Sequence, residues 1–242
     1  MRLSPLKKIS EKIAPYRPAI KMTLRLLGLV IVVPFIATFL LVVAYRFVPV
    51  TYTPFMQAMA DKSGAEVHQQ WVPLEKISKE LQLAVVSSED NLFTKHNGFS
   101  WTAIEAAFSN NAKGKRVHGG STISQQTAKN VFLWNARSWI RKGIEVPVTC
   151  MIELVWGKER IMEVYLNVIE FGPGIFGAEQ AAQTYFHHSA ATLTRAEAAL
   201  MVSVMPNPIK FKIAAPSSYI LKRQAKIMSL MRKIGRVKYE DE

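Results

Sequence analysis

Cysteine is nearly absent from the sequence, and acidic residues are few beside basic ones. The single cysteine, Cys150, excludes an intrachain disulfide and a zinc site built from several cysteines. The chain has 31 Lys and Arg against 18 Asp and Glu, which gives a formal net charge of +13. Its 242 residues suffice for one good-sized core and leave no room for a second large domain.

Charge is missing altogether from Leu26 to Tyr45. These twenty residues are about the length that a helix needs to cross a hydrocarbon core of ~30 Å, so we expect a membrane span. A cleaved signal peptide is the alternative, although its apolar stretch is usually only about 7 to 15 residues long and precedes small residues. Pro34 lies inside the span, where it is a candidate for a kink.

The flanks of this span favour a cytoplasmic N-terminus. Residues 1–25 contain seven basic residues and a single acidic one, and positive flanks remain on the cytoplasmic side. We therefore expect a cytoplasmic tail (1–25), a transmembrane anchor (26–45), a membrane-proximal linker (46–73) and an extracytoplasmic domain (74–242). A basic domain outside the cytoplasm rarely meets nucleic acid, so a phosphorylated lipid or an anionic membrane surface is the expected partner.

Helical patterns dominate the rest of the chain. From Leu74 the pattern predicts one helix, with Glu89 near its C-terminal end. The residues spaced for its buried face are Ile77, Leu81, Ala84, Val85 and Ser88. No alternating pattern lasts long enough to predict a strand. The expected fold class is therefore mainly α.

Capping boxes mark two further helices. Thr122 and Thr194 are each followed three positions later by Gln or Glu, a pattern typical of a helix start. The first box predicts a helix to about Phe132, and the second predicts one through the apolar run 198–205, before Pro206.

Acidic residues are also missing from residues 106–144. This stretch contains seven bases: Lys113, Lys115, Arg116, Lys129, Arg137, Arg141 and Lys142. A field of one sign attracts anions, and such donors are the usual partners of phosphate oxygens, although a solvated basic surface would show the same composition. A glycine pair before Ser121 and Thr122 places backbone donors at a predicted helix start, which suits an anion or a sugar but also describes ordinary turns.

Two groups of carboxylates flank this stretch. Glu89 and Asp90 precede it, and Glu145 follows it. Glycosyl chemistry uses such separated carboxylates, although most surface glutamates have no such role.

Six segments between residues 75 and 215 carry recognisable motifs. They are SSEDNLFTKHNGFSW (87–101), GGSTISQQTAKN (119–130), RKGIE (141–145), KERIMEVYLN (158–167), AAQTYF and AALMVSVMPNP. In order and spacing they resemble the biosynthetic peptidoglycan glycosyltransferases. The resemblance implies a lysozyme-like, mainly α domain with a small lobe near the membrane. Because the chain stops at Glu242, it is similar to the monofunctional branch, which lacks a penicillin-binding transpeptidase domain.

Departures from the family pattern are small. Asn91 stands where a basic residue is common, and Ser124 replaces a frequent threonine. Pro147 follows closely after the second glutamate, where it is a candidate for a helix start.

The resemblance implies an inverting polymerase of the bacterial cytoplasmic membrane. Its donor is the growing glycan on undecaprenyl pyrophosphate, its acceptor is lipid II, and its product has a new β-1,4 bond. Glu89 is then the candidate base, and Glu145 orients the basic cluster or helps to hold a divalent cation, magnesium or manganese. No organic cofactor is expected. The partners implied are lipid II, the nascent glycan, membrane lipid and other cell-wall synthesis proteins, with no nucleic acid.

The family pattern also assigns supporting roles. The cations Lys129, Arg141 and Lys142 would meet the leaving pyrophosphate. Other expected substrate-binding and supporting residues are Asp90, Ser121, Thr122, Gln126 and Asn130, with Phe93 and His96 as supports of the Glu89 loop. For His96 a purely structural role is equally open.

Two rival functions remain from the residues alone. A lysozyme-like or lytic enzyme that cuts the same polymer also uses a carboxylate, but it has no pyrophosphate to hold. An inactive scaffold would retain the fold and could lose both glutamates. A membrane-proximal apolar patch is also expected, with packing beneath the domain as its alternative; its candidates are Phe47, Tyr52, Phe55, Met56 and Met59.

Overall fold

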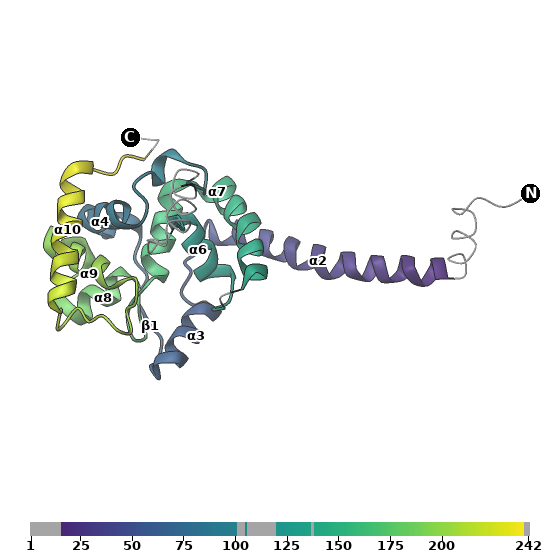
Figure 1. The fold of residues 1–242 in the computed structure, drawn as a ribbon, viewed down its shortest axis with the longest axis horizontal. Helices are drawn as coiled ribbons and strands as arrows, with labels where there is room; N and C mark the ends of the chain where they lie inside the picture. The colour runs from purple at the N-terminus through teal and green to yellow at the C-terminus, as the bar shows by residue number, and fades with distance from the viewer. Residues whose placement is uncertain (1–15, 101–104, 106–119, 137, 240–242) are drawn as a thin grey trace, which may run out of the picture. The chain divides into compact units, whose positions relative to one another are not determined.

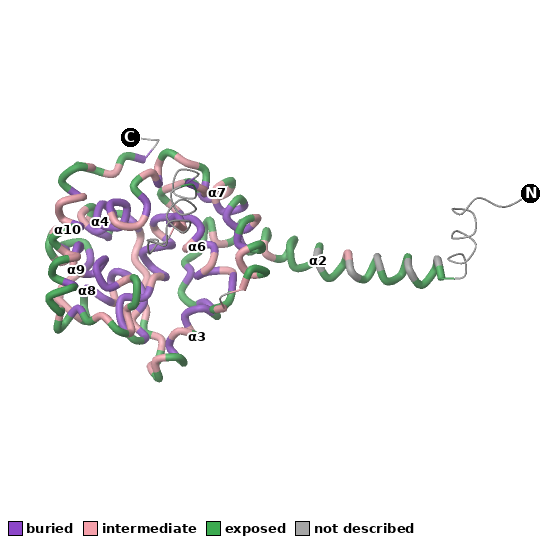
Figure 2. Tube along the Cα trace, viewed as in Figure 1, coloured by how far each residue is buried: buried purple, intermediate pink, exposed green. Residues whose placement is uncertain are grey.

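A computed structural model describes residues 16–100, 105, 120–136 and 138–239 (Figure 1). The chain forms two compact units, Met1–Leu41 and Val42–Glu242. The first unit holds most of helix α2 (Arg17–Tyr45), which contains Pro34. By length and composition, Lys21–Tyr45 is able to cross a membrane, and its described side chains are almost all exposed (Figure 2). Most of the predicted cytoplasmic tail, residues 1–15, lies outside the described residues.

The second unit begins with the last turn of α2. The carbonyl oxygen of Val42 accepts a hydrogen bond of 2.7 Å from the Trp156 indole, and the carbonyl of Tyr45 accepts bonds from the Arg160 guanidinium. Helix α3 (Pro54–Ser63) follows, with Thr53 as its N-cap.

The expected membrane-proximal patch is only partly present. Phe47 and Tyr52 are exposed, but Phe55 and Met56 are buried in the core, so for these two the expectation was wrong. The reason is that one face of α3 packs against α6. Met59 is partly buried and also packs on the core.

Two helical pieces replace the single helix predicted from Leu74. A short 3-10 helix, η2 (Leu74–Lys76), precedes α4 (Lys79–Glu89). The break arises because Ser78 leaves the helical conformation and its hydroxyl accepts the N–H of Glu80 as an N-cap. Helix α4 is buried on nearly every side rather than on one face, and Glu89 is its last residue, as predicted.

Helices α6 (Ile123–Phe132) and α7 (Trp139–Val168) pack against each other. The predicted capping box of Thr122 is confirmed, and so is the end of its helix. Pro147 does not start a helix: α7 begins eight residues earlier, where Ser138 caps it, and Pro147 lies in its interior. Gly157 interrupts α7 with a φ of 74°, a conformation that glycine adopts without strain.

A small sheet was not predicted from the sequence. Its strands are β1 (His68–Gln69), β2 (Glu170–Gly172) and β3 (Ile175–Phe176), in the order β1-β3-β2. Strand β3 pairs parallel with β1 and antiparallel with β2. Strands of two or three residues are too short to show an alternating pattern. In the turn between β2 and β3, Gly174 has a φ of 72°, and a Cβ there would lie 2.1 Å from the Glu66 carbonyl oxygen.

The C-terminal helices complete the second unit. They are α8 (Ala178–Phe186), α9 (Arg195–Val204) and α10 (Ser218–Ile234), with a short 3-10 helix, Ala190–Thr192, between α8 and α9. Another short 3-10 helix, Phe93–Lys95, follows α4. The predicted capping box of Thr194 is confirmed. Helices α4, α9 and α10 pack on one another, so the end of α4 lies beside α10 (Figure 1). The described part of the chain is mainly helical, as predicted.

Candidate active site

Glu89 presents a partly exposed carboxylate at the end of α4. Its side chain is 19% exposed, and each oxygen has a neutral hydrogen-bond donor. The Ser88 hydroxyl donates to Oε1 at 3.2 Å, and the Gln126 amide donates to Oε2 at 3.3 Å. A cation, the Arg223 guanidinium, lies 3.8 Å from Oε1. The carboxylate is therefore held in place without being buried in a close ion pair.

Gln126 links Glu89 to the buried residue Tyr165. The Tyr165 hydroxyl donates to the Gln126 side-chain oxygen at 3.2 Å. Burial raises the pKa of Tyr165 well above its usual value, and the charges of Glu89 and Asp90 raise it further. The phenol therefore remains protonated, and it fixes the Gln126 amide with its N–H₂ group toward Glu89.

Asp90, the neighbour of Glu89, is occupied by structural contacts. It is 7% exposed, and both its oxygens lie 3.0 Å from His96 Nε2. One of them also accepts the backbone N–H of Ile123, in the first turn of α6, at 3.1 Å. Phe93 is fully buried, with the Lys158 ammonium 4.8 Å from its ring centroid. Asp90 and its partner His96 thus tie the loop after α4 to the start of α6, while Phe93 contacts α7 through Lys158.

The second glutamate, Glu145, joins two cations on α7. Its side chain is 3% exposed. Arg141 Nη1 lies 2.6 Å from one of its oxygens, and Lys142 Nζ pairs with the other. Arg141 also donates from Nε to the Ala136 carbonyl at 2.6 Å. Both oxygens of Glu145 are therefore committed to positioning the basic side chains.

These cations line a pocket of about 310 Å³ beside α6. The residues that line it are Ser121, Gln125, Gln126, Lys129, Arg141, Lys142 and Glu145. Gln126 lines this pocket and also donates a hydrogen bond to Glu89. It therefore connects the Glu89 carboxylate to the cationic wall of the pocket, which consists of Lys129, Arg141 and Lys142. The pocket combines one hydroxyl, two amides, three cations and one carboxylate, so positive charges outnumber negative ones and the set suits a phosphorylated sugar.

Lys129 stands between this pocket and a larger one of about 380 Å³, which it lines together with Asn130 and Arg141. Its ammonium lies 4.9 Å from the centroid of the Phe55 ring. Burial lowers the pKa of Lys129, Glu145 opposes this effect, and the neighbouring cations on α7 add to it. An anion entering either pocket would favour the charged form of this lysine.

The remaining predicted residues divide between ligand-facing and structural positions. Ser121 lines the smaller pocket, and its hydroxyl lies 3.4 Å from Lys142 Nζ. Thr122 is 3% exposed and serves as the cap of α6, with its hydroxyl bound to the Gly98 carbonyl. Asn130 is 2% exposed. The predicted bases outside the described residues are Lys113, Lys115, Arg116 and Arg137.

The described side chains do not form a metal site of their own. Among these residues, no group of three or more His, Cys, Asp or Glu side chains lies close enough together to hold a metal ion. Both oxygens of Glu145 are engaged by cations. A divalent cation beside this cluster would therefore depend mainly on oxygens supplied by the substrate.

Three residues of the site were given no role from the sequence. Tyr165 lies within the motif KERIMEVYLN (158–167), but its contact with Gln126 depends on how α6 packs on α7. Arg223 comes from α10, and its only signal is a second acid-free stretch, residues 198–239. Glu170, which lines the larger pocket, had no signal at all.

Comparison with known proteins agrees with this geometry. Residues 56–232 match the family model described as Transglycosylase, and the match confirms the expected lysozyme-like, mainly α class. A protein of Pasteurella multocida, named biosynthetic peptidoglycan transglycosylase, is 52% identical over 203 residues, covering 81% of this chain and 82% of its own. Proteins of the same name from Bacteroides thetaiotaomicron and Shewanella oneidensis are 50% and 55% identical, over 89% and 71% of this chain and 90% and 74% of their own lengths. The chain therefore belongs to the biosynthetic peptidoglycan transglycosylases, a family of glycosyltransferase enzymes.

Proposed function

We propose that this enzyme elongates glycan strands by moving the growing chain from undecaprenyl pyrophosphate onto lipid II. The 4-hydroxyl of the N-acetylglucosamine on lipid II attacks the anomeric carbon of the donor, a β-1,4 bond forms, and the bond to the pyrophosphate breaks. An α-linked donor then gives a β-linked product, so the anomeric centre inverts. Inversion in one step needs a base on the attacking hydroxyl and stabilisation of the leaving group on the opposite face.

The observation that carries this proposal is one available carboxylate linked through Gln126 to a pocket with three cations. Glu89 takes the proton of the attacking hydroxyl, because its oxygens have only neutral donors at hydrogen-bond distance. Lys129, Arg141 and Lys142 meet the negative charge that grows on the leaving pyrophosphate. Pyrophosphate is already a good anionic leaving group, so it needs cations more than an added proton.

Glu145 acts in this proposal by positioning Arg141 and Lys142 rather than by transferring a proton. Ser121, Gln126 and Asn130 contact the sugars or the phosphates, and Asp90, Thr122, Phe93 and His96 hold the loops that carry Glu89 and α6. A divalent cation, if it takes part, is held by the pyrophosphate beside this cluster. No step of the proposed reaction runs through it.

The cationic pocket favours synthesis over the rival reaction. A hydrolase or lytic enzyme has no pyrophosphate to stabilise, and its cleft would have no use for three cations around one glutamate. An inactive scaffold would not need to retain Glu89 in a partly exposed, hydrogen-bonded position.

We also propose that α2 anchors the enzyme in the bacterial cytoplasmic membrane, with its N-terminus inside and the catalytic unit outside. Support comes from the apolar segment Lys21–Tyr45 and from the basic residues that precede it. Residues 56–232 match the Transglycosylase model, so we propose that this part of the chain makes glycan strands, with no cross-linking of their peptides in the proposed reaction. High-salt washing should leave the enzyme in the membrane, and release of a shortened soluble form would show a cleaved signal instead.

Purified full-length protein with labelled lipid II tests the proposed reaction. The expected product is a labelled polymer that muramidase degrades to disaccharide units without peptide cross-links. Failure to form polymer, together with cleavage of added glycan strands, would establish the lytic alternative. Cross-linked fragments would contradict the absence of transpeptidation.

A further inference from the structure

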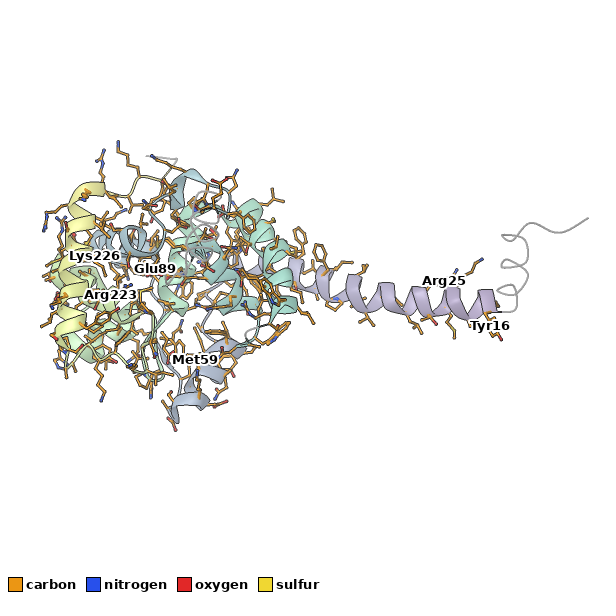
Figure 3. All side chains as sticks on the ribbon, in the orientation of Figure 1. Tyr16, Arg25, Met59, Glu89, Arg223 and Lys226 are labelled. Atoms are coloured by element: carbon orange, nitrogen blue, oxygen red, sulfur yellow. The ribbon has the colours of Figure 1, made fainter. Side chains whose placement is uncertain are left out.

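Arg223, on α10, lies beside the carboxylate of Glu89, the proposed base. From the middle of this helix, its guanidinium Nη2 lies 3.8 Å from Glu89 Oε1 and 3.4 Å from the Ser88 hydroxyl (Figure 3). Its side chain is 19% exposed. Because α10 packs directly on α4, the two side chains are brought together by helix packing rather than by a mobile loop.

The orientation of Arg223 differs from that of the other bases on its helix. The five basic residues of α10, all of which the structure describes, are Lys222, Arg223, Lys226, Arg232 and Lys233, and only Arg223 is not exposed. No acidic residue occurs anywhere between residues 198 and 239. A charge on α10 that turns inward therefore has no acidic partner on its own helix, and Glu89 is the carboxylate that it faces.

Holding a guanidinium in this position has a cost. Arg223 Nε is buried and has no hydrogen-bond partner among the described residues. A buried donor without a partner destabilises a fold, so its presence calls for a compensating interaction. The nearby negative charge of Glu89 supplies that interaction, at a separation that leaves the carboxylate oxygen open to another hydrogen bond.

Two hydrogen-bonded chains meet at the two oxygens of Glu89. On one side, Arg223 donates to the Ser88 hydroxyl, which donates to Oε1. On the other side, Tyr165 donates to Gln126, which donates to Oε2. The first chain ends in a full positive charge and the second in a neutral phenol, so only the first brings a cation to the carboxylate.

We propose that Arg223 is a positioning residue for the reaction: acting directly and through Ser88, it holds the Glu89 carboxylate aimed at the acceptor hydroxyl. This inference rests on the proposed role of Glu89 as the base. Arg223 attracts the carboxylate and fixes its orientation through Ser88. At 3.8 Å it forms no close ion pair, which would block the oxygen that must receive the proton.

Other charged groups near Glu89 do not duplicate this effect. Asp90, which follows it in the chain, is paired with His96. Tyr165 on α7 is neutral. On the α9 side of α4, Arg195 pairs with Glu80 at 2.7 Å. Arg223 is thus the cation that faces Glu89 among the elements packed around it.

The test is the separate measurement of kcat and KM for polymerisation of labelled lipid II by the full-length enzyme in detergent. Arg223→Gln should lower kcat about tenfold and leave KM nearly unchanged, because the base is present but no longer held toward the acceptor hydroxyl. Arg223→Lys retains the charge but loses the contact with Ser88, so it should recover only part of the lost kcat. Lys226→Gln, an exposed base on the same helix, is the matched control and should change neither quantity (Figure 3).

The outcomes separate three possibilities. An unchanged kcat in Arg223→Gln would overturn the inference, and so would equal losses of kcat in Arg223→Gln and Arg223→Lys, because the effect would then not depend on the charge. A rise in KM alone would also overturn it and would assign Arg223 to binding the acceptor. If Arg223→Gln does not fold, as judged by thermal melting, an unchanged kcat in Arg223→Lys would count against the inference. Full activity of Glu89→Gln would instead remove the proposed base, whatever Arg223 does.

Discussion

The two glutamates of the site lie in opposite electrostatic surroundings. Glu145 is almost fully buried and pairs with Arg141 and Lys142, which precede it by four and three residues on the same helix. Glu89 is partly exposed, accepts hydrogen bonds from neutral donors, and faces a single cation, Arg223, which belongs to a distant part of the chain.

This difference separates the chemical roles of the two carboxylates. A carboxylate whose two oxygens hold cations has no oxygen left to take a proton, and protonating it would break both ion pairs. A carboxylate with neutral donors and one more distant cation keeps its oxygens accessible to a substrate hydroxyl. In the proposed reaction, the same residue type therefore serves as an anchor for cations at one wall of the site and as a base at the other.

The largest expected effect comes from Glu89→Gln. Because the amide cannot accept the proton of the attacking hydroxyl, polymerisation should fall by at least ~100-fold, the usual scale for a lost general base. The folded state should be nearly unaffected, since Gln retains the shape of the side chain. Single-turnover rates with labelled lipid II, beside thermal melting, measure both quantities.

The matched change, Glu145→Gln, should affect the stability of the fold more than the Glu89→Gln change does. It leaves Arg141 and Lys142 without their partner, so the free energy of unfolding should fall by roughly 1–3 kcal/mol, below the value for a fully buried pair because Lys142 is 38% exposed. Equal losses of rate and stability in the two variants would erase the distinction drawn between them.

Charge removal at the cationic wall should have the next largest effect. Lys129→Ala and Arg141→Ala should each lower kcat roughly 10- to 100-fold even at saturating lipid II, because the negative charge that they meet grows in the transition state. Steady-state kinetics over a range of lipid II and salt concentrations distinguish this from weaker binding. If kcat stayed at the wild-type value and only KM changed with salt, these cations would attract the substrate without stabilising the transition state.

Sequence reasoning predicted the parts of the site that depend on local spacing. The Thr122 capping box, the position of Glu89 at the end of its helix, and the cluster of Arg141, Lys142 and Glu145 all follow from residues within four positions of one another. Local hydrogen bonds and helical periodicity determine such features, so they are visible before the fold is known.

Contacts between helices were beyond the reach of the sequence. Tyr165 reaches Gln126 across the packing of α6 on α7, and Arg223 reaches Glu89 across the packing of α10 on α4. Local rules also failed at Ser78, where a side-chain cap divides the predicted helix, and at Pro147, which the longer helix α7 includes. The sheet was missed because its strands are too short to show a period.

A third carboxylate, Glu170, is buried like Glu145 but forms no ion pair with any described residue, so its effect should appear in the pH dependence of folding stability. It is 5% exposed, and its Oε2 has no hydrogen-bond partner among the described residues. Burial raises the pKa of Glu170 to about 7, although the Gly174 N–H and the charge of Lys62 oppose this. A raised pKa in the folded state means that the neutral acid favours folding below about pH 4.5, and that this contribution is lost as the pH rises through about 7.

Glu170→Gln should therefore remove the loss of folding stability that the ionised Glu170 carboxylate causes at high pH. At pH 8 the variant should unfold with a free energy higher than the wild type by roughly 2 kcal/mol, and near pH 4.5 the two should agree. Urea unfolding of the full chain in detergent at both pH values measures the difference. A constant difference at every pH would show that Glu170 does not titrate in this range.

The smallest expected effects belong to Lys113 and Lys115, which lie outside the described residues and are assessed from the sequence alone. They share the acid-free stretch with Lys129 and Arg141 but precede the glycine pair, away from the two motifs that form the cationic wall. Charges that act only through a screened field should assist the approach of an anionic substrate without stabilising the transition state. Lys113→Ala or Lys115→Ala should thus raise the apparent KM a few-fold at low salt, leave kcat unchanged, and lose its effect as ionic strength rises. A fall in kcat as large as that of Lys129→Ala would place these lysines at the leaving group as well, and the cationic wall would then extend beyond α6 and α7.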